Sequence, residues 1–240
     1  MPWWSWKKKK ADRPAFSITP RDDESAASKV DLGALAPPLA DYLAGACVLQ
    51  QALASKLSVL SGGAWGSEDA DDLGLASGRA MDRYRRLRTM LEDYVEDVAA
   101  ALSGPRDRLA AHLDRVESAR WYEGVGTAYV VTGFTRDFWH RLATGFDPEV
   151  TTVLQDILKD EGDEDLMAGV LERFLAVDGR YSSRLSLWCR RLVGDTMLIC
   201  RDALSEAAMA HVDAEVRLEP VLTDVVALHT SRLDRLGLTA

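Results

Sequence analysis

A small set of mid-helix positions carries the residues whose types and spacing bear most directly on chemistry inside a helical bundle. These positions are Gln50, Ala80, Arg83, Thr132, Asp160 and Asp163. All except Ala80 place a polar side chain on a helix face that is otherwise apolar. Helical bundles that bind a pair of metal ions direct carboxylates and histidines inward from facing helices. The metal-binding capacity of this set therefore depends on how many of its side chains can act as ligands.

Other arrangements of reactive residues are weaker. The histidines, which are His112, His140, His211 and His229, lie far apart in the sequence. None forms an acid-x-x-His pair at a predicted core position, so we expect them at the surface or at helix ends. No serine follows the strand and Gly-x-Ser-x-Gly turn of a hydrolase. The acidic run from Asp160 to Asp165 lacks the spacing of a calcium-binding loop and is more typical of a solvated face.

The elements that must position these residues are helices. Apolar residues recur at spacings of three and four along most of the chain after residue 38. The predicted helices cover residues 39–60, 68–102, a third that carries Val125 to Leu142, a fourth that Asp147-Pro148-Glu149 opens, 180–211 and 221–236, with a short amphipathic piece at 106–117. We expect Ser103-Gly104-Pro105 to end the second helix and the fourth to continue through Gly162. The predicted fold class is all-α, an antiparallel four-helix bundle with additional C-terminal helices.

Several short runs carry a resemblance to a known family. They are Ala128-Tyr129-Val130 with Gly133 and Asp137-Phe138, then Asp160-Glu161-Gly162-Asp163, and above all the run from Leu185 to Gly194. With these runs, the segment from about Leu39 to Leu204 resembles actinobacterial ferritin-like proteins related to the tRNA 2-methylthio-isopentenyladenosine hydroxylases. The resemblance implies a ferritin-like bundle. It also implies a di-iron oxidoreductase that hydroxylates a modified tRNA nucleoside.

The departures from that family concern its metal ligands. The resemblance implies that the family has a Glu where this chain has Gln50, and a Glu-x-x-His pair where it has Ala80 and Arg83. It also implies an acid near Thr132, and an acid-x-x-His pair where this chain has Asp160 and Asp163. The chain retains two carboxylates and no imidazole there, whereas two iron ions need several anionic oxygens and imidazoles. We therefore expect no cofactor, with iron only if the hydroxylase alternative holds. We expect Arg83 to pair with Asp160 or Asp163, the alternative being that it extends to solvent beside Tyr84.

The N-terminal tail differs in composition from the rest of the chain. It contains Trp3, Trp4 and Trp6, followed by Lys7, Lys8, Lys9 and Lys10. Tryptophan favours the membrane interface, and lysines are attracted to anionic lipid. The same residues could instead anchor the tail on another macromolecule, or the tail could be only a flexible extension. We predict a disordered tail over residues 1–30, a ferritin-like bundle over 31–212 and a C-terminal helical extension over 213–240.

Bulk composition limits the remaining function classes. The chain has 240 residues and a formal net charge of −9, which disfavours a broad nucleic-acid-binding face. Its cysteines, Cys47, Cys189 and Cys200, are too scattered for a disulfide framework and are expected to be buried thiols. We find no apolar run long enough to span a bilayer and no secretory signal. These features predict a cytoplasmic protein, with peripheral membrane contact if the tail binds lipid.

Two functional hypotheses follow. The first is a non-catalytic scaffold or binding module, a pseudoenzyme, whose partner is an unknown macromolecule or an anionic membrane surface. The second is the di-iron-type hydroxylase of a modified tRNA nucleoside. A further possibility is that a residual pocket in the bundle binds a small ligand. Related bundles often pair through helix faces, which suggests a homodimer.

Overall fold

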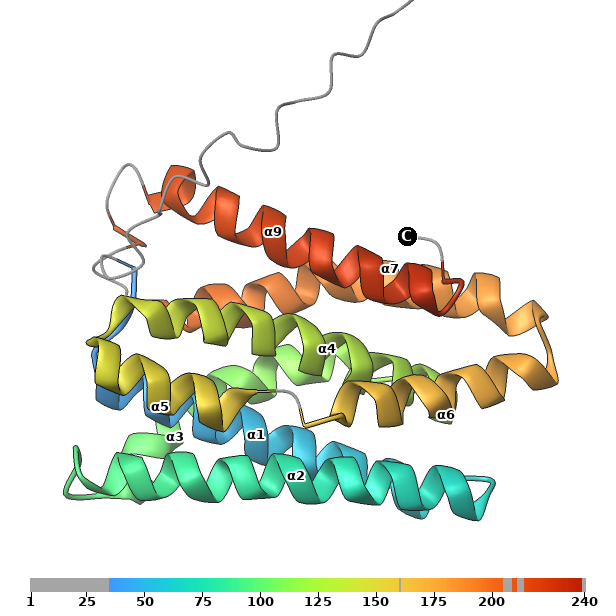
Figure 1. Ribbon diagram of the computed structural model, residues 1–240, viewed down its shortest axis with the longest axis horizontal. Helices are drawn as coiled ribbons and strands as arrows, with labels where there is room; N and C mark the ends of the chain where they lie inside the picture. The colour runs from blue at the N-terminus through green and yellow to red at the C-terminus, as the bar shows by residue number, and fades with distance from the viewer. Residues whose placement is uncertain (1–34, 160, 205–208, 211–213, 239–240) are drawn as a thin grey trace, which may run out of the picture.

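A computed structural model describes residues 35–159, 161–204, 209–210 and 214–238 of the chain. Within those ranges the chain is helical and contains no strand, which confirms the predicted all-α class (Figure 1). The helices are α1 Leu39–Gly62, α2 Ser67–Glu92, α3 Val98–Leu113, α4 Trp121–Leu142, α5 Pro148–Leu158, α6 Asp163–Val177, α7 Arg180–Asp202 and α9 Ala214–Arg235. Short 3-10 turns at Asp114–Val116 and Ala143–Gly145 extend α3 and α4.

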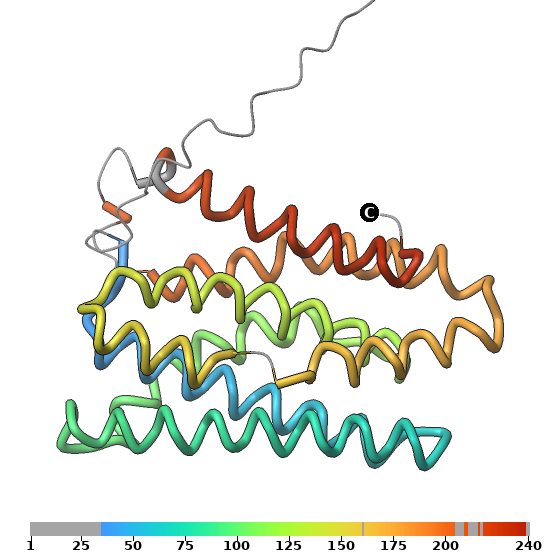
Figure 2. Tube along the Cα trace, viewed as in Figure 1, coloured from blue at the N-terminus to red at the C-terminus, as the bar shows by residue number. Residues whose placement is uncertain are grey.

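Four rows of helices form the bundle. Helix α1 packs along α2, α2 against α6, α6 against α4, and α4 against α1, so the contacts close a ring. Helices α5 and α6 follow one another along the fourth row, as the trace in Figure 2 shows. Ion pairs reinforce one side of the ring, where Arg173 of α6 donates to Asp69 and Asp72 of α2 at 2.7 and 2.6 Å. Short connections make sequential neighbours antiparallel, as predicted.

Helix α4 lies at the centre and is buried on nearly every side. It contacts α1, α5, α6, α7 and α9. Glycines permit these close approaches, because a Cβ atom at Gly124 would lie 2.8 Å from a methyl of Leu60, and one at Gly126 would lie 2.8 Å from a methyl of Leu185. Gly124 and Gly126 therefore form a close-packing site within α4. On a helix that is covered all round, each polar group without a partner is destabilising.

The predicted end of the second helix is wrong. Helix α2 ends at Glu92, and α3 begins after Asp97, whose carboxylate accepts a hydrogen bond from the amide of Ala100 at 3.0 Å. Ser103-Gly104-Pro105 then lies inside α3. Proline costs a helix one backbone hydrogen bond but does not have to end it when packing holds both flanks. Leu102 and Leu109 are buried on either side of Pro105 and supply that packing.

The fourth helix is also interrupted, contrary to the prediction that it continues through Gly162. Helix α5 ends at Leu158, and Gly162 has a φ of +92°, in the left-handed region that favours glycine. Helix α6 therefore restarts at Asp163 with a new N-terminus. This break places Asp163 and Glu164 in the first turn of α6, deep in the bundle.

The C-terminal helices complete the core. Leu218, Val221, Val225 and Leu233 of α9 are buried, and α9 packs mainly on α4. The thiols of Cys47, Cys189 and Cys200 are buried, as predicted, and burial raises their pKa. Contrary to the expectation of no apolar run of that length, α1 is long and apolar enough to cross a membrane. Its buried face packs against α2, as a core helix of a bundle does.

Candidate functional site

Arg83 lies in the interior of the bundle and binds two of the predicted site residues. Its Nε donates to Oε1 of Gln50 at 2.9 Å, and its Nη2 forms an ion pair with Asp163. All three side chains are buried. The prediction that Arg83 pairs with Asp160 or Asp163 is therefore confirmed for Asp163, and the alternative in which Arg83 reaches solvent is wrong. A guanidinium joins helices α1, α2 and α6 at this point.

Local structure at the start of α6 prepares Asp163 for this contact. The N-terminus of a helix carries partial positive charge, which favours a carboxylate in its first turn. Arg79 adds a second contact to Asp163 at 3.4 Å, and a Cβ atom at Gly162 would lie 3.3 Å from the guanidinium of Arg79. A glycine at position 162 therefore serves both the left-handed turn and the approach of Arg79.

The other predicted site residues contribute less. Ala80 is buried among apolar side chains, and the buried hydroxyl of Thr132 has no hydrogen-bond partner among the described residues. Asp160 lies outside the described residues, as does the tail from Trp3 to Lys10. The structure thus brings Gln50, Arg83 and Asp163 together and leaves Thr132 out of their network.

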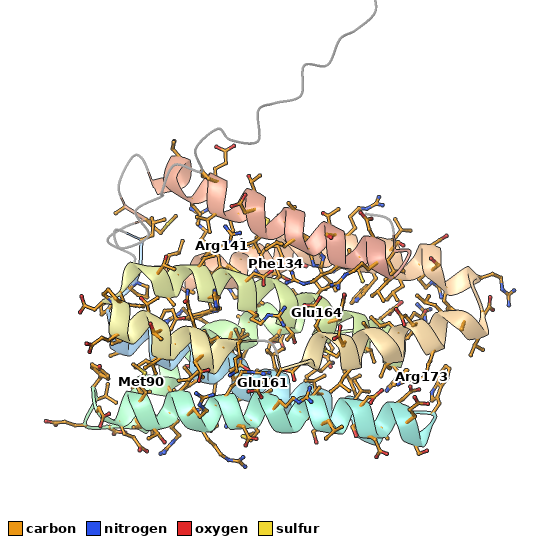
Figure 3. All side chains as sticks on the ribbon, viewed as in Figure 1. Met90, Phe134, Arg141, Glu161, Glu164 and Arg173 are labelled. Atoms are coloured by element: carbon orange, nitrogen blue, oxygen red, sulfur yellow. The ribbon has the colours of Figure 1, made fainter. Side chains whose placement is uncertain are left out.

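A second charge cluster, centred on Glu164, lies on the other side of α6. Its carboxylate accepts hydrogen bonds from Arg136 of α4 at 2.5 Å, and from Arg232 and Arg235 of α9 at 2.9 and 2.6 Å. Arg232 also pairs with Asp137 at 2.6 Å. In Figure 3, Glu164 lies at the start of α6, on the side nearer to α4 and α9. The cluster joins these three helices.

Burial and charge shift the pKa values of this second cluster. Burial alone would raise the pKa of Glu164, but the hydrogen bonds and charges of Arg136 and Arg232 outweigh it and hold that pKa below its usual value. His229, which is 1% exposed, has a pKa lowered to about 4, first by burial and then by the charge of Arg232. Neither of its ring nitrogens has a hydrogen-bond partner in the described part of the chain. His229 is therefore neutral near pH 7.

Sequence reasoning missed most of this second cluster. The histidines were expected at the surface or at helix ends, but His229 is buried. The acidic run was expected to face solvent, but Asp163 and Glu164 within it are buried. One usable signal was Gly133 in the middle of an apolar helix. A Cβ atom there would lie 3.3 Å from Cδ of Arg232, so the missing side chain admits the arginine. A second signal was Arg232 and Arg235, three residues apart on one face of the last helix.

The donor chemistry of both clusters suits ion pairs rather than a di-iron centre. Within the described ranges, no group of three or more His, Cys, Asp or Glu side chains is placed to hold a metal ion. Asp137 and His140 do have acid-x-x-His spacing, but Asp137 pairs with Arg232. The family-like positions include one described carboxylate, Asp163, and it faces two arginines. Such a set does not fit two iron ions, which require more anionic and imidazole ligands.

A cavity of about 680 Å³ lies away from both clusters, between the start of α1, α3 and the end of α7. His112 lines it, and its Nε2 lies 2.5 Å from Oδ2 of Asp202, while Nδ1 lies 3.4 Å from the guanidinium of Arg115. Each ring nitrogen of His112 therefore lies beside a charged side chain. The cavity is also not the vacated bundle centre in which a ligand pocket was expected.

Comparison with known proteins agrees with this architecture. The family model described as "Ferritin-like domain, actinomycetes" matches residues 67–213, well over half of the chain. The chain belongs to this family of actinomycete ferritin-like domains. The match supports the ferritin-like part of the predicted fold. No curated protein matches the chain. The matched segment includes Arg83, Asp163 and Glu164 but ends before Arg232, so the ferritin-like domain contributes only part of the second cluster.

Proposed function

We propose that the protein is a non-catalytic ferritin-like scaffold or binding module. The observation that carries this proposal is the buried Arg83, bound to Gln50 and Asp163. Arginine keeps its charge under all ordinary conditions and repels a metal cation. The interior of this bundle then serves stability, and contact with other molecules takes place at the surface.

Several features support a role without chemistry. The buried carboxylates Glu123, Asp163 and Glu164 are already bound by arginines. His112 uses both of its nitrogens, and His229 is enclosed beside Phe134 with their ring centroids 5.9 Å apart. A general acid or base must reach a substrate proton, and neither the arginine-bound carboxylates nor the enclosed His229 does so. We expect the protein to need no cofactor.

The experiment is a measurement of iron in the purified full chain after anaerobic loading with ferrous iron and desalting. We expect iron well below one ion per chain. The control carries Gln50→Glu, Ala80→Glu, Arg83→His and Asp163→His, which restores the ligand types that the family resemblance implies, and we expect it to retain more iron. About two irons per native chain would overturn the proposal and favour the hydroxylase alternative. The native measurement decides even if the control does not fold.

External contact is proposed to involve the tail residues from Trp3 to Lys10, whose partner is a macromolecule or an anionic membrane surface. We place the protein in the cytoplasm in this proposal. Co-sedimentation with liposomes, with and without residues 1–12, tests the membrane case. Equal sedimentation of the two chains would exclude the tail as the membrane contact.

A further inference from the structure

The three most exposed large apolar side chains of the described chain lie at one end of the bundle. They are Val59 in the last turn of α1, Trp65 in the turn before α2, and Val177 at the end of α6, with exposed fractions of 72%, 72% and 82%. The connection between α1 and α2 and that between α6 and α7 lie at this same end (Figure 1). Single exposed apolar side chains are ordinary on a protein surface, but several at one place indicate contact with another molecule.

One face of the Trp65 ring is covered and the other is open. The ring stacks on that of Trp121, the first residue of α4, with the centroids 5.7 Å apart and an angle of 25° between the planes. It also meets the ring of Phe174 of α6 edge-on at 5.8 Å. Because Trp65 is nevertheless 72% exposed, the face turned away from Trp121 is available to another molecule.

The rings beneath Trp65 are held firmly by the bundle. The indole Nε1 of Trp121 donates to the backbone carbonyl of Leu60 at 2.8 Å, which fixes this ring against α1. Phe174 stacks on Tyr122 of α4 with the centroids 4.6 Å apart, and Tyr181 of α7 packs against both rings. Trp65 therefore rests on a rigid aromatic support, so less conformational entropy is lost when it binds a partner.

The segments that form this end, residues 61–72, 117–123 and 172–181, carry an excess of acidic residues. Each of their arginines is bound by acids of the same segments: Arg120 by Glu123, Arg173 by Glu68, Asp69 and Asp72, and Arg180 by Asp178. Further exposed acids, Asp71, Glu117 and Glu172, form no ion pair within the part of the chain that the structure describes. Negative charge at this end is therefore available to a basic partner.

An open indole face in an acidic region is suited to the side chain of arginine. The planar guanidinium stacks on tryptophan and pairs with a carboxylate at the same time, whereas the compact ammonium of lysine acts as a point charge. Asp71 follows Trp65 by six residues, and Glu117 precedes Trp121 by four, so a carboxylate stands near each of the two stacked rings in the sequence. The same acids repel phosphate, which disfavours an anionic membrane or a nucleic acid at this end.

We propose that the end of the bundle that presents Trp65 is a docking surface for an arginine-rich segment of another protein. A guanidinium of the partner stacks on the open face of Trp65, and neighbouring guanidiniums pair with Asp71 and Glu117. Tryptophan is among the residues that most often dominate the binding energy of a protein interface. This inference goes beyond the proposed function, because it adds a contact through the folded body to the one proposed for the tail.

The test is the fluorescence anisotropy of a fluorescein-labelled octa-arginine peptide titrated with the full chain at low salt. We expect saturable binding that added salt weakens. A labelled octalysine peptide should bind at least about threefold more weakly, since lysine does not stack on the indole as a plane. Trp65→Ala should weaken the binding of octa-arginine by about fivefold or more. The control, Tyr94→Ala, removes an exposed aromatic ring elsewhere and should change the affinity by less than about twofold.

A second pair of variants tests the charges and keeps Trp65, in case Trp65→Ala does not fold. Asp71→Asn with Glu117→Gln should weaken binding by about threefold or more. The matched control, Asp107→Asn with Glu149→Gln, removes the same charge from exposed positions outside this end and should lose less than about twofold. Equal losses in the two double variants, equal affinity for the two peptides, or no binding at low salt would each overturn the inference. Iron content measured on the same preparation tests the proposed function separately.

Discussion

Asp163 and Glu164 are neighbours in the sequence but hold two different networks. Asp163 binds arginines of α2 on one side of α6, and Arg83 in turn binds Gln50 of α1. Glu164 binds arginines of α4 and α9 on the other side. The first network joins α2 and α6, which lie within the match to the family, to Gln50 of α1, which precedes it. The second depends on a helix beyond residue 213, where the match to the family ends.

The two networks balance buried charge with protein side chains in different ways. In the first network Arg83 binds the carboxylate of Asp163 and the side-chain amide of Gln50. Arg83 therefore keeps a neutral partner, Gln50, if the charge of Asp163 is removed. In the second, Glu164 accepts hydrogen bonds from three arginines, and one of them, Arg232, also pairs with Asp137. Removing one member of a buried ion pair leaves an uncompensated charge, which is strongly destabilising. We therefore expect the second network to be the more sensitive one.

The largest expected effect is that of Glu164→Gln. The substitution keeps the shape but leaves Arg136 and Arg232 with too little negative charge, so the free energy of unfolding should fall by about 3–5 kcal/mol. Urea unfolding at pH 7 measures it. The matched control is Glu161→Gln on an exposed residue nearby, expected to stay within about 0.5 kcal/mol. Equal effects of the two substitutions would remove the distinction between buried and exposed carboxylates.

The next effect concerns pH and distinguishes the networks, because only the second contains a histidine. His229 has a pKa of about 4 in the folded chain and an ordinary value of 6.5. Between those values the unfolded chain binds the proton more readily, so stability falls as pH decreases from 6.5 to 4, by up to about 3 kcal/mol. His229→Leu should flatten this part of the stability curve. Glu164 and the other carboxylates are present in both chains, so their contribution cancels when the two stability curves are compared. A difference in stability between the two chains that stays constant from pH 6.5 to 4 would contradict the low pKa of His229.

A smaller effect is expected for Asp163→Asn. The amide oxygen can still accept from Arg83, Gln50 remains bound, and Arg79 is partly exposed, so the cost should be about 2 kcal/mol. The free energies of unfolding of Arg83→Met and of the double variant complete a double-mutant cycle. We expect Asp163→Asn to cost at least about 1 kcal/mol less when Arg83 is already methionine. Additive costs would mean that Arg83 and Asp163 do not stabilise one another.

The smallest effect tests the space that admits Arg232. Gly133→Ala places a methyl 3.3 Å from that side chain, so the arginine must move and the protein should lose about 1 kcal/mol despite a better helix former. Gly194→Ala is the control, because its Cβ has open space, and it should gain about 0.5–1 kcal/mol. Thermal unfolding measures both. Stabilisation by both alanines would show that Arg232 does not need the gap.

Part of the site was predictable because its signals are local. Apolar spacing of three and four predicts helices such as α1 and α4, and Asp147-Pro148-Glu149 correctly predicts the start of α5. A lone arginine on an apolar face needs an anionic partner, and Asp160 and Asp163 stood at matching positions. A pairing of Arg83 with one of the two followed from that requirement, and the structure places Asp163 in the contact.

The sequence by itself determined the helical class, the burial of the cysteines and the pairing of Arg83 with Asp160 or Asp163, because periodicity and charge complementarity are written into short segments. The tertiary structure decided the break at Gly162 and the partners of Glu164. Arg232 and Glu164 are 68 residues apart, and only the packing of α9 on α4 brings them together. It also decided that His229 is enclosed while the arginines of α7 face outward, since burial depends on which surfaces neighbouring helices cover.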